Sequence, residues 1–173
     1  MARRPIVAGI RTREEEPQPE DDLPLDELRE ALACWSSGVA VLAVRDEGDV
    51  VAMTVSSFSS LSLRPPLVML AVDGQAAVLP SLEEVGRFTV SILADDQRRL
   101  ALSYADRFPF EQAFAAGEAD PVLAAALASL VCTVAQVHPG GDHRIVVGRV
   151  ERVELGRDAP PLVYHRREYR TLR

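Results

Sequence analysis

Residues 129–155 decide the fold, reading SLVCTVAQVH (129–138), PGGD (139–142) and HRIVVGRVERVEL (143–155). Both long segments are rich in β-branched residues, which are typical of strands. The Pro-Gly-Gly-Asp segment between them has the composition of a tight turn. This stretch therefore predicts a long antiparallel β-hairpin.

Strands of the same kind are predicted on both sides of this hairpin. They are GVAVLAVR (38–45), VVAMTVSS (50–57), LVMLAVD (67–73), RFTVSIL (87–93) and a strand-turn-strand in the closing PLVYHRREYRTL (161–172). The first two form a further predicted hairpin around a polar turn. About six hairpin-connected strands with short helices between them predict a mainly β fold, an antiparallel barrel that is closed or nearly closed.

Short helices are expected between the strands. Leu25, Leu28, Leu32 and Trp35 recur at helical spacing, and we expect this apolar stripe to pack in the core. Further helices are predicted near residues 80–85, around Leu100 to Tyr104 and at residues 121–127. Residues 1–23 have no apolar periodicity and many charges, which predicts a disordered or loosely attached tail (1–23) before a single domain (24–173).

Composition argues against several classes of protein. A net charge of −7 disfavours a nucleic-acid surface, and no apolar run approaches the ~20 residues of a membrane-spanning helix. Two cysteines do not make a disulfide framework, so we expect a cytoplasmic protein. All 19 basic residues are arginine, so a bound phosphate has to be held by arginine, hydroxyls or backbone amides.

The sequence also lacks the motifs of common catalytic sites. No Gly-x-Gly-x-x-Gly follows a strand, and no His-Glu-x-x-His, Cys-x-x-Cys or Gly-x-Ser-x-Gly occurs. A Rossmann nucleotide site, a metal site and a hydrolase nucleophile are therefore not predicted. The segment that stands out is MTVSSFSSLSLRPP (53–66), whose hydroxyls lie at a strand end. Its composition fits either a serine-rich strand-to-loop transition or a site that offers hydrogen bonds to a planar cofactor.

The order of four motifs resembles the flavin reductase-like family. Besides residues 53–66, these are RFTVSIL (87–93), GDHRIVVG (141–148) and PLVYHRREY (161–169), and the resemblance covers about residues 25–172. It implies a six-stranded split β-barrel of the FMN-binding type, forming a homodimer with the flavin near the subunit interface. It also implies reduction of FMN or FAD by NADH or NADPH, often to supply a separate monooxygenase.

The same resemblance suggests which residues form the site. His143 would lie near the nicotinamide as the catalytic residue, and Thr54, Ser56 and Ser57 would hold the flavin ring and ribityl chain. The full set of cofactor-binding positions that it implies is Thr54, Val55, Ser56, Ser57, Gln75, Ala76, Ala77, Arg87, Tyr164, Arg166 and Tyr169.

The chain departs from the family pattern in the loop DGQAA (73–77), where many relatives have Asn-Arg-Ser-x-Ser. This change removes two hydroxyls and one positive charge. Backbone amides of residues 74–77 and the following helix are then expected to hold a phosphate, with Arg87 or an arginine of the second subunit adding charge. Weak, exchangeable flavin binding follows. The alternative is a flavin-binding or cofactor-less barrel without reductase turnover.

Overall fold

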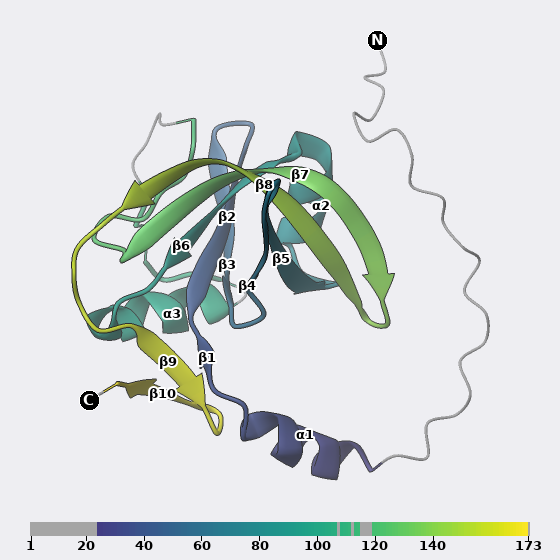
Figure 1. Cartoon of the computed structure of the whole chain (residues 1–173), viewed down its shortest axis with the longest axis vertical. Coiled ribbons are helices and arrows are strands. Elements are labelled where there is room, and N and C mark those ends of the chain that lie inside the picture. Colours follow the sequence, from purple (N-terminus) through teal and green to yellow (C-terminus); the bar gives the residue numbers. More distant parts are fainter. Residues whose placement is uncertain (1–23, 107, 112, 115–118, 173) are drawn as a thin grey trace.

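The computed structural model describes residues 24–106, 108–111, 113, 114 and 119–172, so the tail predicted at residues 1–23 lies outside it. Seven antiparallel strands form the main sheet, in the order β3-β2-β6-β7-β8-β5-β4, which curls into a split barrel (Figure 1). Its strands are β2 (Ala40–Asp46), β3 (Asp49–Val55), β4 (Ser59–Leu63), β5 (Pro66–Asp73), β6 (Arg87–Ile92), β7 (Ala128–Gly140) and β8 (His143–Leu155).

A smaller sheet and four helical segments complete the described part of the chain. The sheet has the order β1-β9-β10 and consists of β1 (Ser37–Gly38), β9 (Leu162–His165) and β10 (Glu168–Thr171). The helical segments are α1 (Leu25–Ala33), α2 (Val78–Val85), the 3-10 turn η1 (Asp95–Gln97) and α3 (Arg98–Ala105). The mainly β barrel is confirmed, with β1 and β4 added to the predicted strands. None of the described helices is long and apolar enough to cross a membrane.

The β7–β8 hairpin predicted from residues 129–155 is confirmed, with a tighter turn than expected. Pro139 and Gly140 still belong to β7, which leaves Gly141 and Asp142 as the two-residue turn, with Gly141 at φ 68°. Such turns need a positive φ, which glycine adopts without steric cost. Register shifts between Val131 and Cys132 and between Val134 and Gln136 mark β-bulges. Bulges bend a strand, which helps this long hairpin to wrap around the barrel.

The barrel is packed on both sides of β2, whose residues 40–44 are all buried. Leu42 and Val44 face the main core, together with Phe88 of β6 and with residues of α2. Val41 points the other way, into a second cluster that includes Tyr104 of α3. Burial of both faces explains why residues 38–45 read as a nearly continuous apolar run rather than as an alternating one.

One close approach in the main core depends on glycine. Gly148 of β8 lies directly under the Phe88 ring, and a Cβ atom added there would be 2.4 Å from Cζ of that ring. Phe88 is the largest fully buried side chain of the described residues. The absent side chain of Gly148 therefore makes the space in which this ring is packed.

The helix predicted at residues 121–127 is wrong. Three side chains on one face of β6 bind this segment in a non-helical form. Arg87 pairs with Asp120, the Thr89 hydroxyl donates to the Pro121 carbonyl, and Ser91 Oγ accepts the Leu123 N–H at 3.2 Å. These long-range bonds fix the backbone in place of the local i→i+4 bonds that a helix would need.

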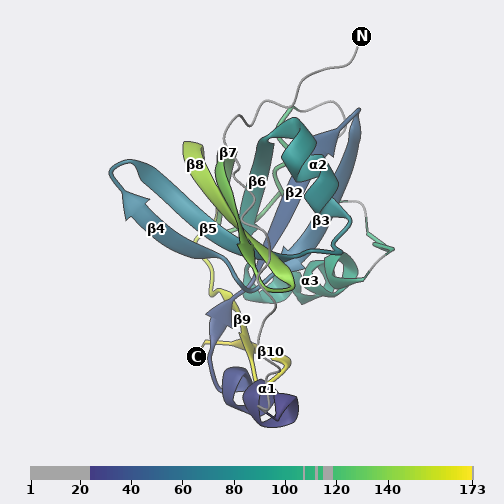
Figure 2. The same ribbon diagram turned by 90° about the vertical axis from the view of Figure 1, so that its right-hand side faces the viewer.

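The apolar stripe of α1 forms the predicted helix, but the expectation that it packs in the core is wrong for the single chain. No residue of α1 is buried, and the side chains of Leu32 and Trp35 are 63 % and 78 % exposed. Figure 2 shows α1 beside β9 and β10, away from the main sheet. It is attached there through the Arg166 N–H, which donates to the Ala33 carbonyl at 2.8 Å.

Candidate functional site

The side chains of the hydroxyl-bearing segment at the end of β3 differ in their hydrogen bonds and in their burial. Thr54 donates to the Ala101 carbonyl of α3 at 2.7 Å, and Val55 is buried in the main core. Ser57 is hydrogen-bonded to β5 through the backbone of Ala71. Ser56 is exposed, and its hydroxyl has no hydrogen-bonding partner within the described residues. Of the three hydroxyls expected to hold a flavin, only that of Ser56 is without a hydrogen bond within the described residues, so it alone can still donate its proton to a ligand.

The loop after β5 is largely satisfied by its own neighbours. Gly74 donates its N–H to the Asp142 carbonyl at 2.9 Å, Gln75 donates to Asp73 Oδ1 at 2.7 Å, and Ala76 donates to the Asp73 carbonyl at 3.0 Å. Three of the four backbone amides expected to hold a phosphate are therefore already occupied. The amide of Ala77, just before α2, makes no hydrogen bond within the described residues.

The tip of the β7–β8 hairpin lies against this loop. His143 is the register partner of Asp73, so the predicted catalytic residue and the predicted phosphate loop are brought together. His143 Nδ1 lies 2.6 Å from Asp142 Oδ1, and the imidazole is 41 % exposed. Because a carboxylate only accepts, Nδ1 carries the proton and Nε2 is left to face a ligand. The same hydrogen bond lowers the pKa of Asp142.

Arg144, the next residue of β8, was not selected from the sequence. It is paired with Val72, one position before the 73–77 loop begins. Its side chain shares a face with Val72 and Val146, both of which belong to the main core together with α2 residues. Arg144 is half-buried, and its guanidinium has one long contact, 3.4 Å, to the His143 carbonyl. We call residues 54–57, 73–77 and 142–144 together the open end of the barrel.

Arg87 belongs to a different place. Its guanidinium binds Asp120 through Nε at 2.6 Å and Nη2 at 3.1 Å, and Arg152 reaches the same carboxylate at 2.9 Å. The Asp120 side chain is only 13 % exposed. These hydrogen bonds hold the pKa of Asp120 below its usual value and raise that of Arg87. We call Arg87, Asp120 and Arg152 the arginine–aspartate cluster.

Register places this cluster far from the 73–77 loop and the β7–β8 hairpin tip. Arg87 pairs with Thr133, Thr133 with Arg149 and Arg149 with Leu67, whereas the loop begins at Asp73. Six residues of strand separate these two levels of β5, which is about 20 Å.

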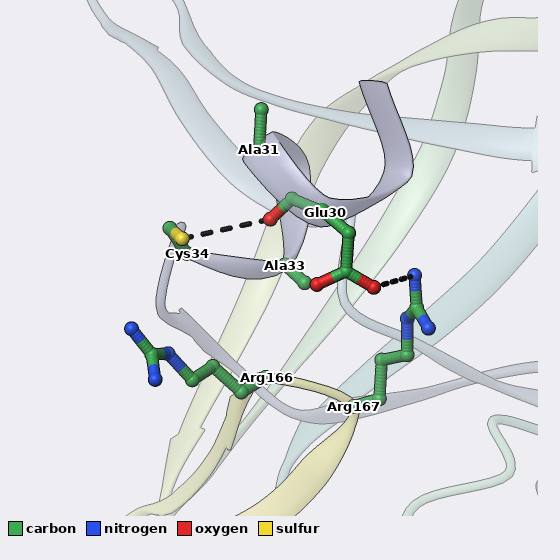
Figure 3. Close-up of a pocket in the computed structure, with 6 residues that line it drawn as sticks. All are labelled: Glu30, Ala31, Ala33, Cys34, Arg166 and Arg167. Atoms are coloured by element: carbon green, nitrogen blue, oxygen red, sulfur yellow. Dashed lines mark hydrogen bonds and ion pairs between the residues drawn. The ribbon is translucent and has the colours of Figure 1, made fainter. Parts of the chain in front are cut away.

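The three remaining predicted residues lie on the β9–β10 hairpin. The rings of Tyr164 and Tyr169 have centroids 5.4 Å apart and pack against the second cluster, and burial raises the pKa of Tyr169. Figure 1 shows this hairpin apart from the tip of β7–β8. A groove of about 550 Å³ lies between its turn and α1, lined by Glu30, Ala31, Ala33, Cys34, Arg166 and Arg167. In Figure 3, Arg167 extends to Glu30 and Arg166 lies on the side of Cys34.

Comparison with known proteins places this arrangement in a family. Residues 32–173 match the model of the flavin reductase like domain. The chain belongs to this family. Among curated relatives it is 48 % identical, over 84 % of its length and 95 % of the other's, to the reductase component of 4-hydroxyphenylacetate 3-monooxygenase from Thermus thermophilus. It is 38 % identical to an NADH-dependent flavin reductase of a Rhodococcus species, over 84 % and 85 % of the two chains.

The split barrel of the family is also seen among solved structures. The NADH:FAD oxidoreductase SgcE6 of Streptomyces globisporus C-1027, in complex with NAD and FAD fragments, superposes with a TM-score of 0.81. It is 29 % identical, and the match covers 92 % of this chain and 98 % of that one. The resemblance inferred from four sequence motifs is thus confirmed. What those motifs missed is Asp142 as the hydrogen-bonding partner of the adjacent His143 and Arg144 as a neighbour of the loop. The first depends on the side-chain geometry at the hairpin tip, and the second depends on pairing between distant strands.

Proposed function

We propose that this chain is a flavin reductase that uses NADH or NADPH to reduce FMN or FAD at the open end of its barrel. The observation that carries this proposal is the meeting of the exposed Ser56 hydroxyl, the free Ala77 amide and the imidazole of His143 at one end of a family barrel. The curated relatives named as flavin reductases support turnover over the alternative of a barrel that binds flavin without reducing it.

The groups at the open end fit a flavin. A bound flavin supplies an acceptor for the hydride of a reduced nicotinamide. Ser56 offers a hydroxyl for the edge of the ring system or the ribityl chain. Ala77 and Arg144 offer an N–H and a guanidinium to a phosphate, which replace the loop residues that this chain lacks. Few charged contacts are available, so the flavin is held weakly and exchanges with solvent, as a substrate does.

His143 is the residue that we place beside the nicotinamide. Hydride transfer depends on stacking and orientation more than on a strong acid or base. Asp142 holds the imidazole through Nδ1, so Nε2 is left free to contact a bound nicotinamide. Tyr164, Arg166 and Tyr169 belong to a second part of the site in this proposal, at the surface where α1 and the β9–β10 hairpin meet another subunit.

The direct test is oxidation of NADH and of NADPH by the purified full chain, followed by absorbance at 340 nm with and without added FMN or FAD. We expect oxidation that saturates with flavin and exceeds the rate of the same flavin without protein. Replacing His143 by Ala should lower kcat/KM for the nicotinamide by about tenfold or more while FMN affinity is kept. A wild-type chain that binds FMN but oxidises neither nucleotide would favour the carrier alternative.

The proposal includes a homodimer in which α1 covers a second copy of the chain. A nine-residue helix without a buried side chain is unstable alone in water, and its apolar face needs a partner surface. Leu61 and Leu63 of the edge strand β4 are exposed as well, so β4 is a second apolar surface that a partner can cover. Two copies related by a two-fold axis can bury both at once.

Light scattering at micromolar concentration tests the dimer. The full chain should have about twice the 18.9 kDa mass of one copy. Leu32→Asp on α1 should shift the protein to monomer, because a charge would be buried in the interface. The matched control is Leu102→Asp on α3, another exposed leucine, which should stay dimeric. A monomeric wild type that turns over at full rate would contradict this part of the proposal.

The partner of the reaction is proposed from the relatives. Two of them are reductase components or subunits of flavin-dependent monooxygenases, so we infer that the reduced flavin leaves this chain for a separate monooxygenase. We place both in the cytoplasm, where reduced nicotinamide is available. Consumption of NADH should then be coupled to hydroxylation of a substrate only when a monooxygenase is added. Catalase, which removes hydrogen peroxide, should not abolish formation of the hydroxylated product.

A further inference from the structure

The Ser57 hydroxyl occupies an unusual position in the sheet. It donates to the Ala71 carbonyl at 2.7 Å and accepts the Ala71 N–H at 3.2 Å, so one side chain satisfies both backbone groups of a single strand residue. The edge strand β4 begins only at Ser59, which pairs with Met69. Two residues further along, Ala71 has no strand partner on that edge. Ser57 takes the place of the missing backbone partner.

The strand that Ser57 holds leads directly to the rest of the open end. Two residues beyond Ala71, Asp73 is the register partner of His143, and Gly74 donates its N–H to the Asp142 carbonyl at 2.9 Å. A continuous path of backbone contacts therefore joins the end of β3 to the hairpin tip. Ser56, next to Ser57, lies at one end of this path, and the imidazole of His143 lies at the other.

We infer that Ser57 is a positioning residue, which sets the distance between the flavin-facing Ser56 and the nicotinamide-facing His143 by holding β5 at Ala71. This inference rests on the proposed function, because the two ends matter only if they face flavin and nicotinamide. It differs from the assignment that the family resemblance implies, in which Ser57 binds the flavin itself. The proton and one lone pair of its hydroxyl are directed at β5, so the hydroxyl has no proton left to donate to a ligand.

Amide hydrogen exchange in the flavin-free full chain separates a positioning role from a ligand role. Ser57→Ala should raise the exchange rate of the Ala71 amide by about tenfold, because that amide loses its acceptor. Ser57→Thr keeps a hydroxyl and should restore slow exchange. Ser59→Ala is the matched control, since the Ser59 hydroxyl bonds only the neighbouring Ser60 carbonyl, and it should leave Ala71 unchanged.

Steady-state kinetics with NADH and FMN complete the test. Ser57→Ala should raise KM for NADH by about threefold to tenfold with a smaller change in kcat, and Ser57→Thr should return both toward wild type. Ser56→Ala should instead raise the FMN dissociation constant by a similar factor and leave the Ala71 amide protected.

Two results would overturn the inference. In the first, Ser57→Ala weakens FMN binding while Ala71 exchange in the flavin-free chain stays slow, which makes Ser57 a ligand. In the second, Ala71 exchange rises but the kinetics with NADH stay at wild-type values, which makes the bond structural only. A wild-type chain that oxidises no NADH with FMN or FAD overturns the proposed function instead, and the protection of Ala71 in that chain still reports whether the bond exists.

Discussion

The open end of the barrel and the arginine–aspartate cluster are built from similar groups that are treated differently. In the cluster, the Asp120 carboxylate receives three hydrogen bonds from Arg87 and Arg152 and is nearly covered. At the open end, the Ser56 hydroxyl and the Ala77 amide have no partner within the described residues. Polar groups that are paired with each other stabilise the fold, whereas polar groups that are left unpaired can bind a ligand.

This difference predicts opposite effects of substitution. A change in the cluster should lower stability and leave catalysis unaltered, because its groups are paired with other side chains of the chain. A change at the open end should impair binding or turnover and leave stability unaltered.

Arg144→Gln should have the largest effect. We expect the FMN dissociation constant to rise by about tenfold to a hundredfold, since a charge-assisted contact to the phosphate is worth ~1.5–3 kcal/mol. Affinity for riboflavin, which has no phosphate, should stay the same, and both can be measured by quenching of flavin fluorescence.

Arg149→Gln is the control for Arg144, because this exposed arginine of β8 lies at the level of Leu67, far from the open end. It should leave both affinities unchanged. Equal weakening of FMN and riboflavin binding by Arg144→Gln would place the guanidinium at the ring instead of the phosphate.

Asp120→Asn should act on stability alone. Loss of the charge is expected to lower the free energy of unfolding by about 1–2 kcal/mol at neutral pH, discounted because both arginines are partly exposed. Urea denaturation measures the loss, and kcat/KM for NADH should not change. A fall in kcat/KM without a fall in stability would mean that the cluster belongs to the site.

The pH dependence of this variant has a definite sign. The folded pKa of Asp120 lies below its ordinary value of 3.8, so the carboxylate contributes its full stability above about pH 4 to 5. That contribution is lost as the pH falls through the folded pKa. The stability gap between wild type and Asp120→Asn should therefore be constant near neutrality and should close in acid. A gap that widens in acid would exclude this explanation.

Asp142→Asn should have a moderate effect on turnover. An asparagine can present its NH₂ group to Nδ1 and so favour the other tautomer of His143, which places a proton on Nε2. We expect kcat/KM for NADH to fall by about threefold to tenfold, with FMN affinity and melting temperature unchanged. Unaltered kinetics would show that the orientation of this exposed imidazole does not matter.

Arg167→Gly should have the smallest effect, and it is the only one in the stabilising direction. Arg166 and Arg167 form the β9–β10 turn at φ 50° and 63°, and glycine adopts a positive φ without steric cost. Relief of this strain outweighs the exposed ion pair with Glu30, so the free energy of unfolding should rise by about 0.5 kcal/mol. A loss of stability on urea denaturation would show that the ion pair with Glu30 contributes more free energy than the backbone strain costs.

Much of the fold could be predicted because its determinants are local. The two long β-type segments within residues 129–155 and the Pro-Gly-Gly-Asp segment between them predict the hairpin without reference to any other segment. The segment 121–127 shows the limit of such reasoning. Its alanine-rich sequence favours a helix, but side chains of β6, about 30 residues earlier, bind its backbone in another conformation. The expected packing of α1 in the core is wrong for a related reason. An apolar stripe predicts that a helix face is covered, but it does not show whether the same chain or a second copy covers it.

The site could be predicted in outline only. Motif order selected Ser56 and His143 as candidates, and the β5–β8 register explains why the loop at residues 73–77 lies beside that histidine. The separate uses of Thr54, Ser56 and Ser57 could not be seen in the sequence, where the three hydroxyls are equivalent. The commitment of Arg87 to Asp120 depends on a contact 33 residues apart, which a single sequence does not reveal.

The contact between Gly148 and Phe88 has a consequence for how this protein can be changed. A side chain of any size at position 148 would have to occupy space that the aromatic ring already fills. Directed evolution of the reductase can therefore explore the open end broadly, but it should find no neutral replacement at this glycine unless position 88 shrinks in the same step. A paired library at positions 88 and 148 would reach sequences that two single-site libraries cannot.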